Sequence, residues 1–254
     1  MTEAAIKLIV TDIDNTLVQR HTHQATDTVI DAIKTLQRNN IHVAAATARP
    51  IGYVADLLRV SGLHGPQVID GGATIYDLDT DAVLWQRWLD VERLRSIVRV
   101  LLPFTAEVDY FPDMKIVPTA EVVIENIVES APYVFARAVA ANRVAQIRAL
   151  LADVSDIDCA IVDGQDGVSD IQVCDVRATK EHGVMQLQQL LGVLPETTLA
   201  IGDGENDLAL FRVADTRVAM GNASELLKDQ ATHITSTVHE DGWARAMENL
   251  RLVG

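Results

Sequence analysis

The chain has 254 residues, 48% of them hydrophobic, and a formal net charge of −15. This length allows one large domain or a core with a smaller second domain, and the charge argues against nucleic acid or an anionic membrane as partner. No run of about eighteen uncharged apolar residues occurs, so no membrane span is predicted. Cys159 and Cys174 have no metal-type spacing and form no disulfide framework. Without a secretory signal pattern, they favour a cytoplasmic protein.

The N-terminal part of the chain alternates between strand-like and helix-like segments. Apolar runs typical of buried strands occur at 6–11, 42–46 and 67–70, and helical periodicity occurs at 27–38 and 51–60. Thr28 and Asp31 stand at capping-box spacing at the start of the first helix. Strand–helix–strand repetition with short connections predicts parallel βαβ units.

The middle of the chain, from 77 to 177, has a different pattern. Two short segments, 74–76 and 82–88, flank an aspartate-rich turn and predict a hairpin. Further strands are expected at 114–117, 133–138, 159–162 and 168–173, and helices at 91–102 and 143–151. This mixture predicts a separate α+β domain with an antiparallel sheet.

The alternating α/β pattern resumes in the last third of the chain. Helices are expected at 180–191, 207–213, 224–230 and 242–250, and strands at 198–201, 216–220 and 234–236. The predicted fold class is therefore α/β. A Rossmann-like parallel-sheet core of residues 1–76 and 178–254 is interrupted by an inserted α+β domain of residues 77–177.

Polar side chains follow several of the predicted core strands or open a predicted helix. They are Asp12 and Asp14 after the first strand, Thr47 after the second, Lys180 at a helix start, and Asp203 and Asp207 after the strand 198–201. The carboxyl edge of an open α/β sheet is where ligands bind. Carboxylates gathered there would repel one another unless a cation joined them, and oxygen ligands suit Mg²⁺. Asp203 can complete such a metal site, and Asp207 can orient its neighbours.

These residue types can perform phosphoryl transfer. A carboxylate such as Asp12 can attack a phosphoryl group and form an aspartyl phosphate, which splits a difficult hydrolysis into two steps. Asp14 is near enough to protonate the leaving oxygen and then to activate water. Thr47 can donate a hydrogen bond to phosphate, and Lys180 at a helix N-terminus can face an anion.

The motifs resemble those of the haloacid dehalogenase superfamily of phosphohydrolases, in particular its Cof-like branch, subfamily IIB. Residues 12–17, 46–49, 178–180 and 202–207 are similar to the four motifs in order, and 218–223 is also similar to this branch. A domain inserted between the second and third motifs is the arrangement of the group with a type-two cap. The resemblance implies a core of that family, with a cap that largely sets substrate choice.

The resemblance also implies the chemistry of the acidic residues. Asp12 would be the nucleophile and Asp14 the general acid and base. Mg²⁺ would be held by the Asp12 side chain, the Asp14 backbone carbonyl and the Asp203 side chain. By the same resemblance, the sequence belongs to an enzyme that needs Mg²⁺ as its cofactor.

The phosphate-binding residues follow from the same comparison. Thr47 and Lys180 would grip the phosphate of the substrate. Asn206 would join this group, and together with Asp207 it would support the metal and Lys180.

Three positions depart from the family pattern: Ala48 follows Thr47 where glycine is usual, Asp70 precedes Gly71 where Asn-Gly is frequent, and Glu181-His182 separate Lys180 from Gly183. None of these changes removes a catalytic group, but each bears on the substrate. Arg49, Asp70 and Gly71 are possible substrate contacts. Arg49 could equally form a salt bridge, and Asp70 could be an ordinary turn residue.

The sequence thus predicts a Mg²⁺-dependent phosphomonoesterase that acts on a small phosphorylated metabolite through an aspartyl phosphate. A sugar phosphate, phosphoglycolate or a phosphorylated cofactor all remain possible substrates. A phosphomutase of the same superfamily would pass the phosphoryl group to a sugar instead of water. A non-catalytic protein that binds a phosphorylated ligand is the other alternative, although a pure binder has no need of Asp14.

Overall fold

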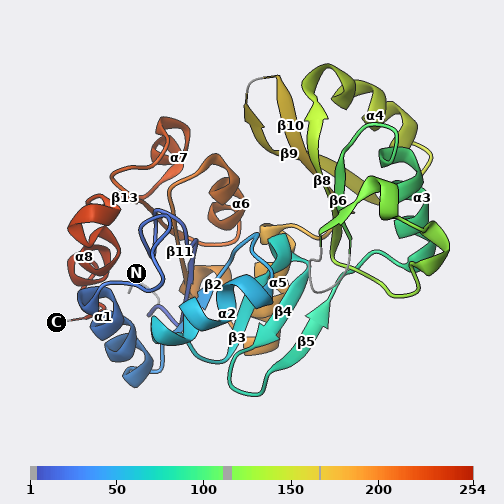
Figure 1. Ribbon diagram of the computed structural model, residues 1–254. Coiled ribbons are helices and arrows are strands. Elements are labelled where there is room, and N and C mark those ends of the chain that lie inside the picture. The colour runs from blue at the N-terminus through green and yellow to red at the C-terminus, as the bar shows by residue number, and fades with distance from the viewer. Residues whose placement is uncertain (1–4, 111–115, 166, 254) are drawn as a thin grey trace. The chain divides into compact units, whose positions relative to one another are not determined.

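The computed structural model describes residues 5–110, 116–165 and 167–253. The chain forms two compact units, Met1–Trp85 with Thr179–Gly254, and Gln86–Ala178. We call them the core unit and the inserted unit (Figure 1). The first boundary lies further along the chain than the expected position after residue 76, because the hairpin that ends at Gln86 pairs with a core strand.

The core unit is built on a parallel five-stranded sheet in the order β13-β12-β11-β1-β2. The strands are β1 (Leu8–Thr11), β2 (His42–Ala45), β11 (Thr198–Gly202), β12 (Thr216–Ala219) and β13 (His233–Ile234). β1 lies between β2 and β11, and its residue Leu8 pairs with His42 on one side and Thr198 on the other. Because neighbouring parallel strands end at the same edge, the segments after β1, β2 and β11 meet there.

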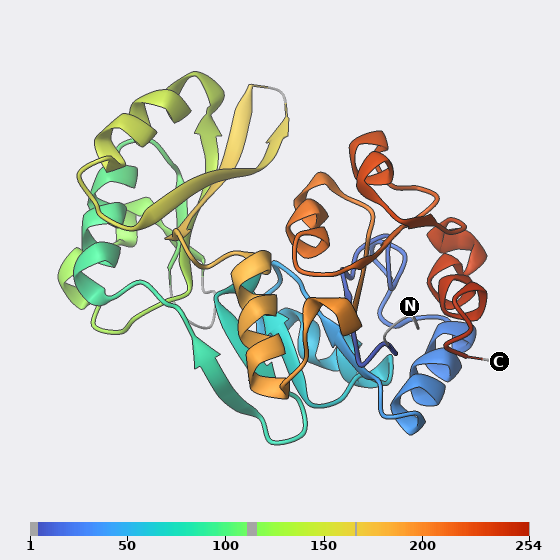
Figure 2. The same ribbon diagram turned by 180° about the vertical axis from the view of Figure 1, so that it is seen from behind.

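Helices cover both faces of this sheet, which explains why β1 and β11 are fully buried. They are α1 (Asp27–Arg38), α2 (Ile51–Val60), α5 (Lys180–Leu191), α6 (Leu208–Phe211), α7 (Glu225–Gln230) and α8 (Gly242–Asn249). Seen from opposite sides, α2 lies in front of the sheet in Figure 1 and α5 in front of it in Figure 2. The bounds predicted for α1, α2 and α5 are confirmed. The expected capping box of Thr28 and Asp31 is wrong, since Thr26 caps α1 by accepting a hydrogen bond from Val29 N.

A second, three-stranded sheet extends the core unit. β3 (Pro66–Ile69) joins β2 through a single parallel bridge between Ala46 and Val68. It then pairs antiparallel with β4 (Thr74–Asp77), and β5 (Ala82–Gln86) completes the hairpin that the sequence predicted. Between β3 and β4 the chain turns through a 3-10 turn, η1 (Asp70–Gly72), whose three residues all have positive φ angles.

The inserted unit contains an antiparallel sheet in the order β7-β6-β8-β10-β9. Its elements are α3 (Val91–Leu101), β6 (Glu107–Asp109), β7 (Ile116–Pro118), β8 (Tyr133–Ala140), α4 (Val144–Leu151), β9 (Ile157–Gln165) and β10 (Val168–Asp175). The two helices and the sheet enclose an apolar core of their own. The strand expected at 114–117 falls partly outside the described residues, which resume at 116. β6 was not predicted, because three residues are too short to show a period.

One buried ion-pair group joins the two ends of the inserted unit. The Asp175 carboxylate is fully buried and lies 3.1 Å from Arg87 Nε and 3.0 Å from Arg93 Nη1. Asp175 ends the last strand of the unit, whereas Arg87 and Arg93 belong to its beginning. Burial alone would raise the pKa of Asp175, but hydrogen bonds from the Arg177 backbone and from the two arginine side chains lower it.

The remaining 3-10 turns are η2 (Thr119–Glu121), η3 (Ile124–Asn126), η4 (Ala141–Arg143), η5 (Pro195–Thr197), η6 (Glu205–Asp207) and η7 (Val238–Glu240). Over the described ranges, none of the helices is long and apolar enough to cross a bilayer. A parallel-sheet core interrupted by an antiparallel α+β unit confirms the predicted fold class.

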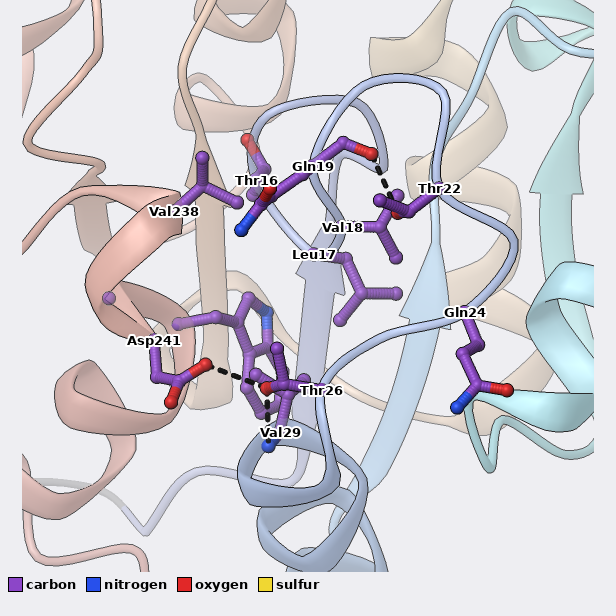
Figure 3. A pocket seen from close by; sticks show the side chains of 12 residues that line it. Thr16, Leu17, Val18, Gln19, Thr22, Gln24, Thr26, Val29, Val238 and Asp241 are labelled. Atoms are coloured by element: carbon purple, nitrogen blue, oxygen red, sulfur yellow. Dashed lines mark hydrogen bonds between the residues drawn. The ribbon is translucent and has the colours of Figure 1, made fainter.

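A cavity of about 110 Å³ lies beneath the loop that follows β1 (Figure 3). We call it the Trp243 cavity. Apolar side chains form most of its walls: Leu17, Val18, Val29, Val238 and Trp243. The polar or small residues Thr16, Gln19, Thr22, Gln24, Thr26, Asp241 and Gly242 complete the lining. The cavity thus lies within the core unit, between the first loop and the C-terminal helix.

Candidate active site

Lys180 joins two of the carboxylates that follow core strands. Its Nζ donates hydrogen bonds to Asp12 Oδ1 at 2.6 Å and to Asp207 Oδ1 at 2.8 Å. All three side chains are buried. Thr179 caps α5 by accepting from His182 N, so Lys180 is the first helical residue and its ammonium reaches the strand ends. Buried charges are tolerated when they are paired and hydrogen-bonded, and this triad satisfies that condition.

Burial and the neighbouring charges both shift the pKa values of Asp12 and Lys180. Burial is the largest cause that raises the pKa of Asp12, to about 7, and Asp207 raises it further while Lys180 opposes the change. Burial alone would lower the pKa of Lys180, but the carboxylates of Asp12 and Asp207 outweigh it and raise that pKa. Lys180 therefore stays an ammonium, and its charge does not fully compensate the acids around it.

Both carboxylate oxygens of Asp207 accept hydrogen bonds within the core unit. Its Oδ1 accepts from Lys180, and its Oδ2 accepts from the backbone N–H groups of Asp203 at 3.0 Å and Gly204 at 3.1 Å. A Cβ at Gly202 would lie 2.5 Å from the Asp207 side chain, so only glycine fits there. The loop after β11 is therefore wrapped around Asp207, which fixes both the loop and Lys180.

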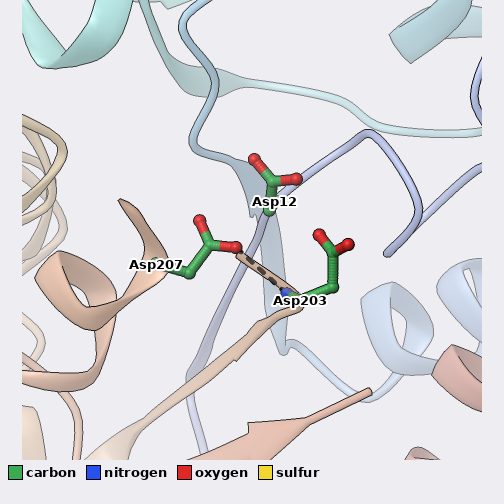
Figure 4. A group of neighbouring side chains, drawn as sticks. All are labelled: Asp12, Asp203 and Asp207. Carbon is green, nitrogen blue, oxygen red and sulfur yellow. Dashed lines mark hydrogen bonds between the residues drawn. The ribbon is translucent and has the colours of Figure 1, made fainter. Parts of the chain in front are cut away.

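Asp12, Asp203 and Asp207 form an acidic cluster, with carboxylate oxygens within 4.8 Å of one another (Figure 4). Asp203 is held by Thr16 Oγ1, which donates to its Oδ1 at 3.2 Å, and by Asn222 Nδ2 at 3.4 Å. Burial and the Asp207 charge raise the pKa of Asp203. No described residue donates a hydrogen bond to Asp12 Oδ2. An all-oxygen donor set with excess negative charge is chemically suited to Mg²⁺.

Asp14 lies beside the cluster and is bound by Arg49. The guanidinium donates from Nε to Asp14 Oδ2 at 3.0 Å and from Nη2 to Oδ1 at 2.5 Å. This two-pronged geometry is the strong form of an arginine–carboxylate pair, and it fixes orientation as well as charge. Both side chains are about one-third exposed, so the pair faces solvent on one side.

Thr47 is buried at the end of β2, where its Oγ1 accepts from Arg49 N at 3.1 Å. Its backbone carbonyl accepts from Gly71 N, which ties it to the turn after β3. In that turn Asp70 is only 5% exposed, and its Oδ1 has no hydrogen-bond partner. Burial raises the pKa of Asp70 to about 6, against a hydrogen bond from Thr74. Ala48, between Thr47 and Arg49, is exposed.

The structure brings most, but not all, of the expected site residues into contact. Asp12, Lys180, Asp203 and Asp207 converge, whereas the exposed Asn206 makes no hydrogen bond with a described residue. The sequence reasoning gave no role to Thr16 or Asn222. Both residues lie in stretches that resemble family motifs, and that position could have indicated a role for them in the site. The catalytic roles of all these residues remain predictions.

The model of the haloacid dehalogenase-like hydrolase family matches residues 9–131 and 124–247 of this chain. No protein of curated function matches it in sequence. Solved structures match it across nearly their whole length. A haloalkanoate-superfamily phosphatase from Bacteroides thetaiotaomicron has a TM-score of 0.82 and 21% identity, covering 98% of this chain and 96% of its own.

Two further structures show the same likeness. A subclass IIB sugar phosphatase has a TM-score of 0.76 and 21% identity, over 97% of this chain and all of its own. A protein from Thermotoga maritima has a TM-score of 0.81 and 18% identity, over 96% of this chain and 97% of its own. At such identities the likeness shows a common fold. Since the family model covers nearly the whole chain and all four motifs, the protein belongs to the haloacid dehalogenase-like hydrolase family.

Proposed function

We propose that the protein is a Mg²⁺-dependent phosphomonoesterase that acts on a small phosphorylated metabolite through an aspartyl phosphate. The observation that supports this most is the convergence of Asp12 with Lys180 and Asp203 at the carboxyl edge of the sheet. A carboxylate nucleophile, a cation for the phosphoryl group and a second carboxylate for a metal are the parts that phosphoryl transfer needs. Sugar phosphates are the first class to test, because one similar structure is a sugar phosphatase.

The donor set at the cluster fits a magnesium ion. Asp12 and Asp203 would hold it with the backbone carbonyl of Asp14, while Asp207, which accepts hydrogen bonds from Lys180 and from the backbone of Asp203 and Gly204, would support them. When bound, the ion supplies charge neutralisation for the transferring phosphoryl group. Burial raises the pKa of Asp12 and Asp203 and the neighbouring carboxylates add to it, and the ion would relieve this repulsion.

In the first step the free carboxylate oxygen of Asp12 attacks phosphorus. The new bond from Asp12 to phosphorus forms as the bond to the ester oxygen breaks, and Asp14 gives its proton to that leaving oxygen. Thr47 and Lys180 bind the phosphoryl oxygens and hold them in line. Arg49 sets the orientation of the Asp14 carboxyl group.

In the second step water replaces the alcohol. Asp14 takes a proton from water, the water oxygen attacks phosphorus, and the bond to Asp12 breaks. Inorganic phosphate leaves, and Asp14 again carries the proton for the next cycle. The same group thus acts first as acid and then as base.

We further propose that the inserted unit is the cap that sets substrate choice, and that the site works in a reducing cytoplasm. Its independent apolar core supports the first point, because a unit with its own core can move as a body. The free thiols of Cys159 and Cys174 support the second.

The test is phosphate release from p-nitrophenyl phosphate and a panel of sugar phosphates, phosphoglycolate and phosphorylated cofactors, with Mg²⁺ or with a chelator. Asp12→Asn should abolish release, and Asp31→Asn, at an exposed position of α1, is the matched control. Release that survives Asp12→Asn would refute the nucleophile assignment. Interconversion of sugar phosphates without release would identify a mutase, and phosphate binding without turnover would identify a non-catalytic binder.

A further inference from the structure

The Trp243 cavity lies beneath the loop that follows β1, and that loop begins at Asp12. Its volume of about 110 Å³ is somewhat below the roughly 150 Å³ of an engineered cavity that takes up benzene. Trp243 is 1% exposed, and Leu17, Val29 and Val238 are also buried. An apolar body of about five non-hydrogen atoms is therefore the size of guest that this space admits.

The polar part of the cavity carries a single charge. Asp241 is the one charged side chain among the described residues that line it, and no cation lies among them. Its Oδ1 accepts from Thr26 Oγ1 at 2.7 Å, as Figure 3 shows. No described residue donates a hydrogen bond to Asp241 Oδ2. The side-chain amides of Gln19 and Gln24, also in the lining, make no hydrogen bond with a described residue.

We propose that the Trp243 cavity is a binding site for a small organic cation, an ammonium group on a short aliphatic body. The carboxylate of Asp241 provides the counter-charge, and the indole of Trp243 provides a surface that attracts cations as well as alkyl groups. A negatively charged guest would be repelled by Asp241, because no cation among the described lining residues offsets this repulsion. The binding proposal does not rest on the phosphatase function proposed above, because binding is measured without turnover.

Two hydrogen-bonded routes connect this cavity with the acidic cluster. Trp243 Nε1 donates to Thr11 Oγ1 at 3.1 Å, and Thr11 Oγ1 donates to the backbone carbonyl of Asp12 at 2.7 Å. Thr16 lines the cavity and donates to Asp203 Oδ1. A guest that moves the indole or Thr16 therefore alters the support of both Asp12 and Asp203, which makes the cavity an effector site for the cluster.

Nuclear magnetic resonance of the full chain tests the proposal with three probes that share one branched four-carbon skeleton: isobutylammonium, isobutanol and isobutyrate. The three tryptophans give three indole N–H signals, and Trp243→Phe identifies the one that belongs to the cavity. We expect isobutylammonium to shift this signal with a dissociation constant of roughly 1–10 mM, as suits a ligand of this size. Isobutanol should bind several-fold more weakly and isobutyrate not at all. The amide signals of Thr11, Asp12 and Thr16 should move with the indole signal.

Asp241→Asn is the decisive variant. Asp241 has a φ of 55°, a conformation that asparagine also adopts readily, so this change removes the charge and keeps the backbone. It should weaken isobutylammonium about tenfold, as expected for the loss of a charge-assisted hydrogen bond, and leave isobutanol unchanged. Glu248→Gln, at an exposed position of α8, the helix that follows Asp241, should change neither.

Three results would overturn the proposal. One is the absence of any shift of the Trp243 signal with isobutylammonium, which would mean that the cavity is a packing space. Another is equal binding of the amine by wild type and Asp241→Asn. The third is movement of the Asp12 and Thr16 amide signals without the Trp243 indole signal, because the amine would then bind at the acidic cluster instead.

Discussion

Gly72 lies in backbone contact with Thr179: a Cβ atom at position 72 would be 2.0 Å from the Thr179 carbonyl oxygen. Gly72 also has a φ of 104°, which side chains rarely adopt. Thr179 caps the helix that begins with Lys180. The turn after β3 therefore sets the position of the lysine that holds Asp12.

Gly72→Ala should destabilise the protein strongly, because either the turn or the start of α5 has to move. We expect a loss of about 3 kcal/mol or more in the free energy of unfolding, measured by urea denaturation. Gly192→Ala is the control, since Gly192 has a φ of 65° but no atom within 4 Å of the added carbon. That change should cost only about 1 kcal/mol. Equal losses would show that the contact with Thr179 is not what constrains Gly72.

Lys180→Met should destabilise the protein, because the ammonium group now offsets the repulsion between Asp12 and Asp207. Asp12 and Asp207 would be left buried without a cation, and removing one partner of a buried pair costs about 3–5 kcal/mol. Adding Asp207→Asn to this variant should restore part of the loss, because one carboxylate charge is removed. Lys34→Met, which breaks an exposed pair with Asp31, should cost less than about 1 kcal/mol. Thermal unfolding without added metal would compare these variants.

Asp70→Asn should stabilise the protein above neutral pH. Burial raises the pKa of Asp70 from 3.8 to about 6, so the folded state favours the protonated acid. The protonated Asp70 side chain therefore contributes to the free energy of unfolding at low pH. This contribution is lost as the pH rises through about 6. Each pH unit between the two pKa values is worth about 1.4 kcal/mol, so the loss is about 3 kcal/mol.

The asparagine variant removes this dependence and suits the φ of 54° at position 70. Denaturation at pH 8 should show the variant to be more stable than wild type, and the difference should shrink towards pH 4. Asp56→Asn, at an exposed position of α2, is the control. If the difference in the free energy of unfolding between wild type and Asp70→Asn is the same at both pH values, the pKa of Asp70 is not raised by burial.

Arg49→Lys should affect catalysis according to the leaving group, provided that the proposed function holds. Lysine keeps the charge but cannot form the two-pronged contact with Asp14. We expect kcat to fall about tenfold to a hundredfold for alkyl phosphates, which need a proton from Asp14. The fall should be much smaller for p-nitrophenyl phosphate, whose leaving group is stable as an anion.

Arg59→Lys, at an arginine paired with the exposed Asp81, provides the comparison. Equal losses for both kinds of ester in Arg49→Lys would assign Arg49 to phosphate binding rather than to the orientation of Asp14. An unchanged kcat for both would remove it from the mechanism.

The sequence predicted what depends on local pattern. α1, α2 and α5 have clear periodicity and end signals, and their bounds were found correctly. The meeting of Asp12 with Asp203 followed from a general property of parallel sheets, since adjacent strands end at one edge.

Contacts between distant segments had no such signal. The pair of Asp14 with Arg49 depends on side-chain reach, and the bond of Trp243 to Thr11 joins residues 232 positions apart. The position of the first unit boundary depended on the pairing of β4 with β3. Such contacts are set by tertiary packing, which outweighs local preference.

The place of β1 between β2 and β11 also has a consequence for how the protein is made. Leu8 pairs with His42, which follows soon after, but also with Thr198, which is made about 190 residues later. At roughly 5–20 residues per second, a ribosome needs about 10–40 s to supply that second neighbour. Until then one edge of an apolar strand has unpaired backbone groups, and such an edge can pair with other chains. The yield of protein in a cell should therefore depend on chaperones that shield the nascent chain more than on the stability of the finished fold.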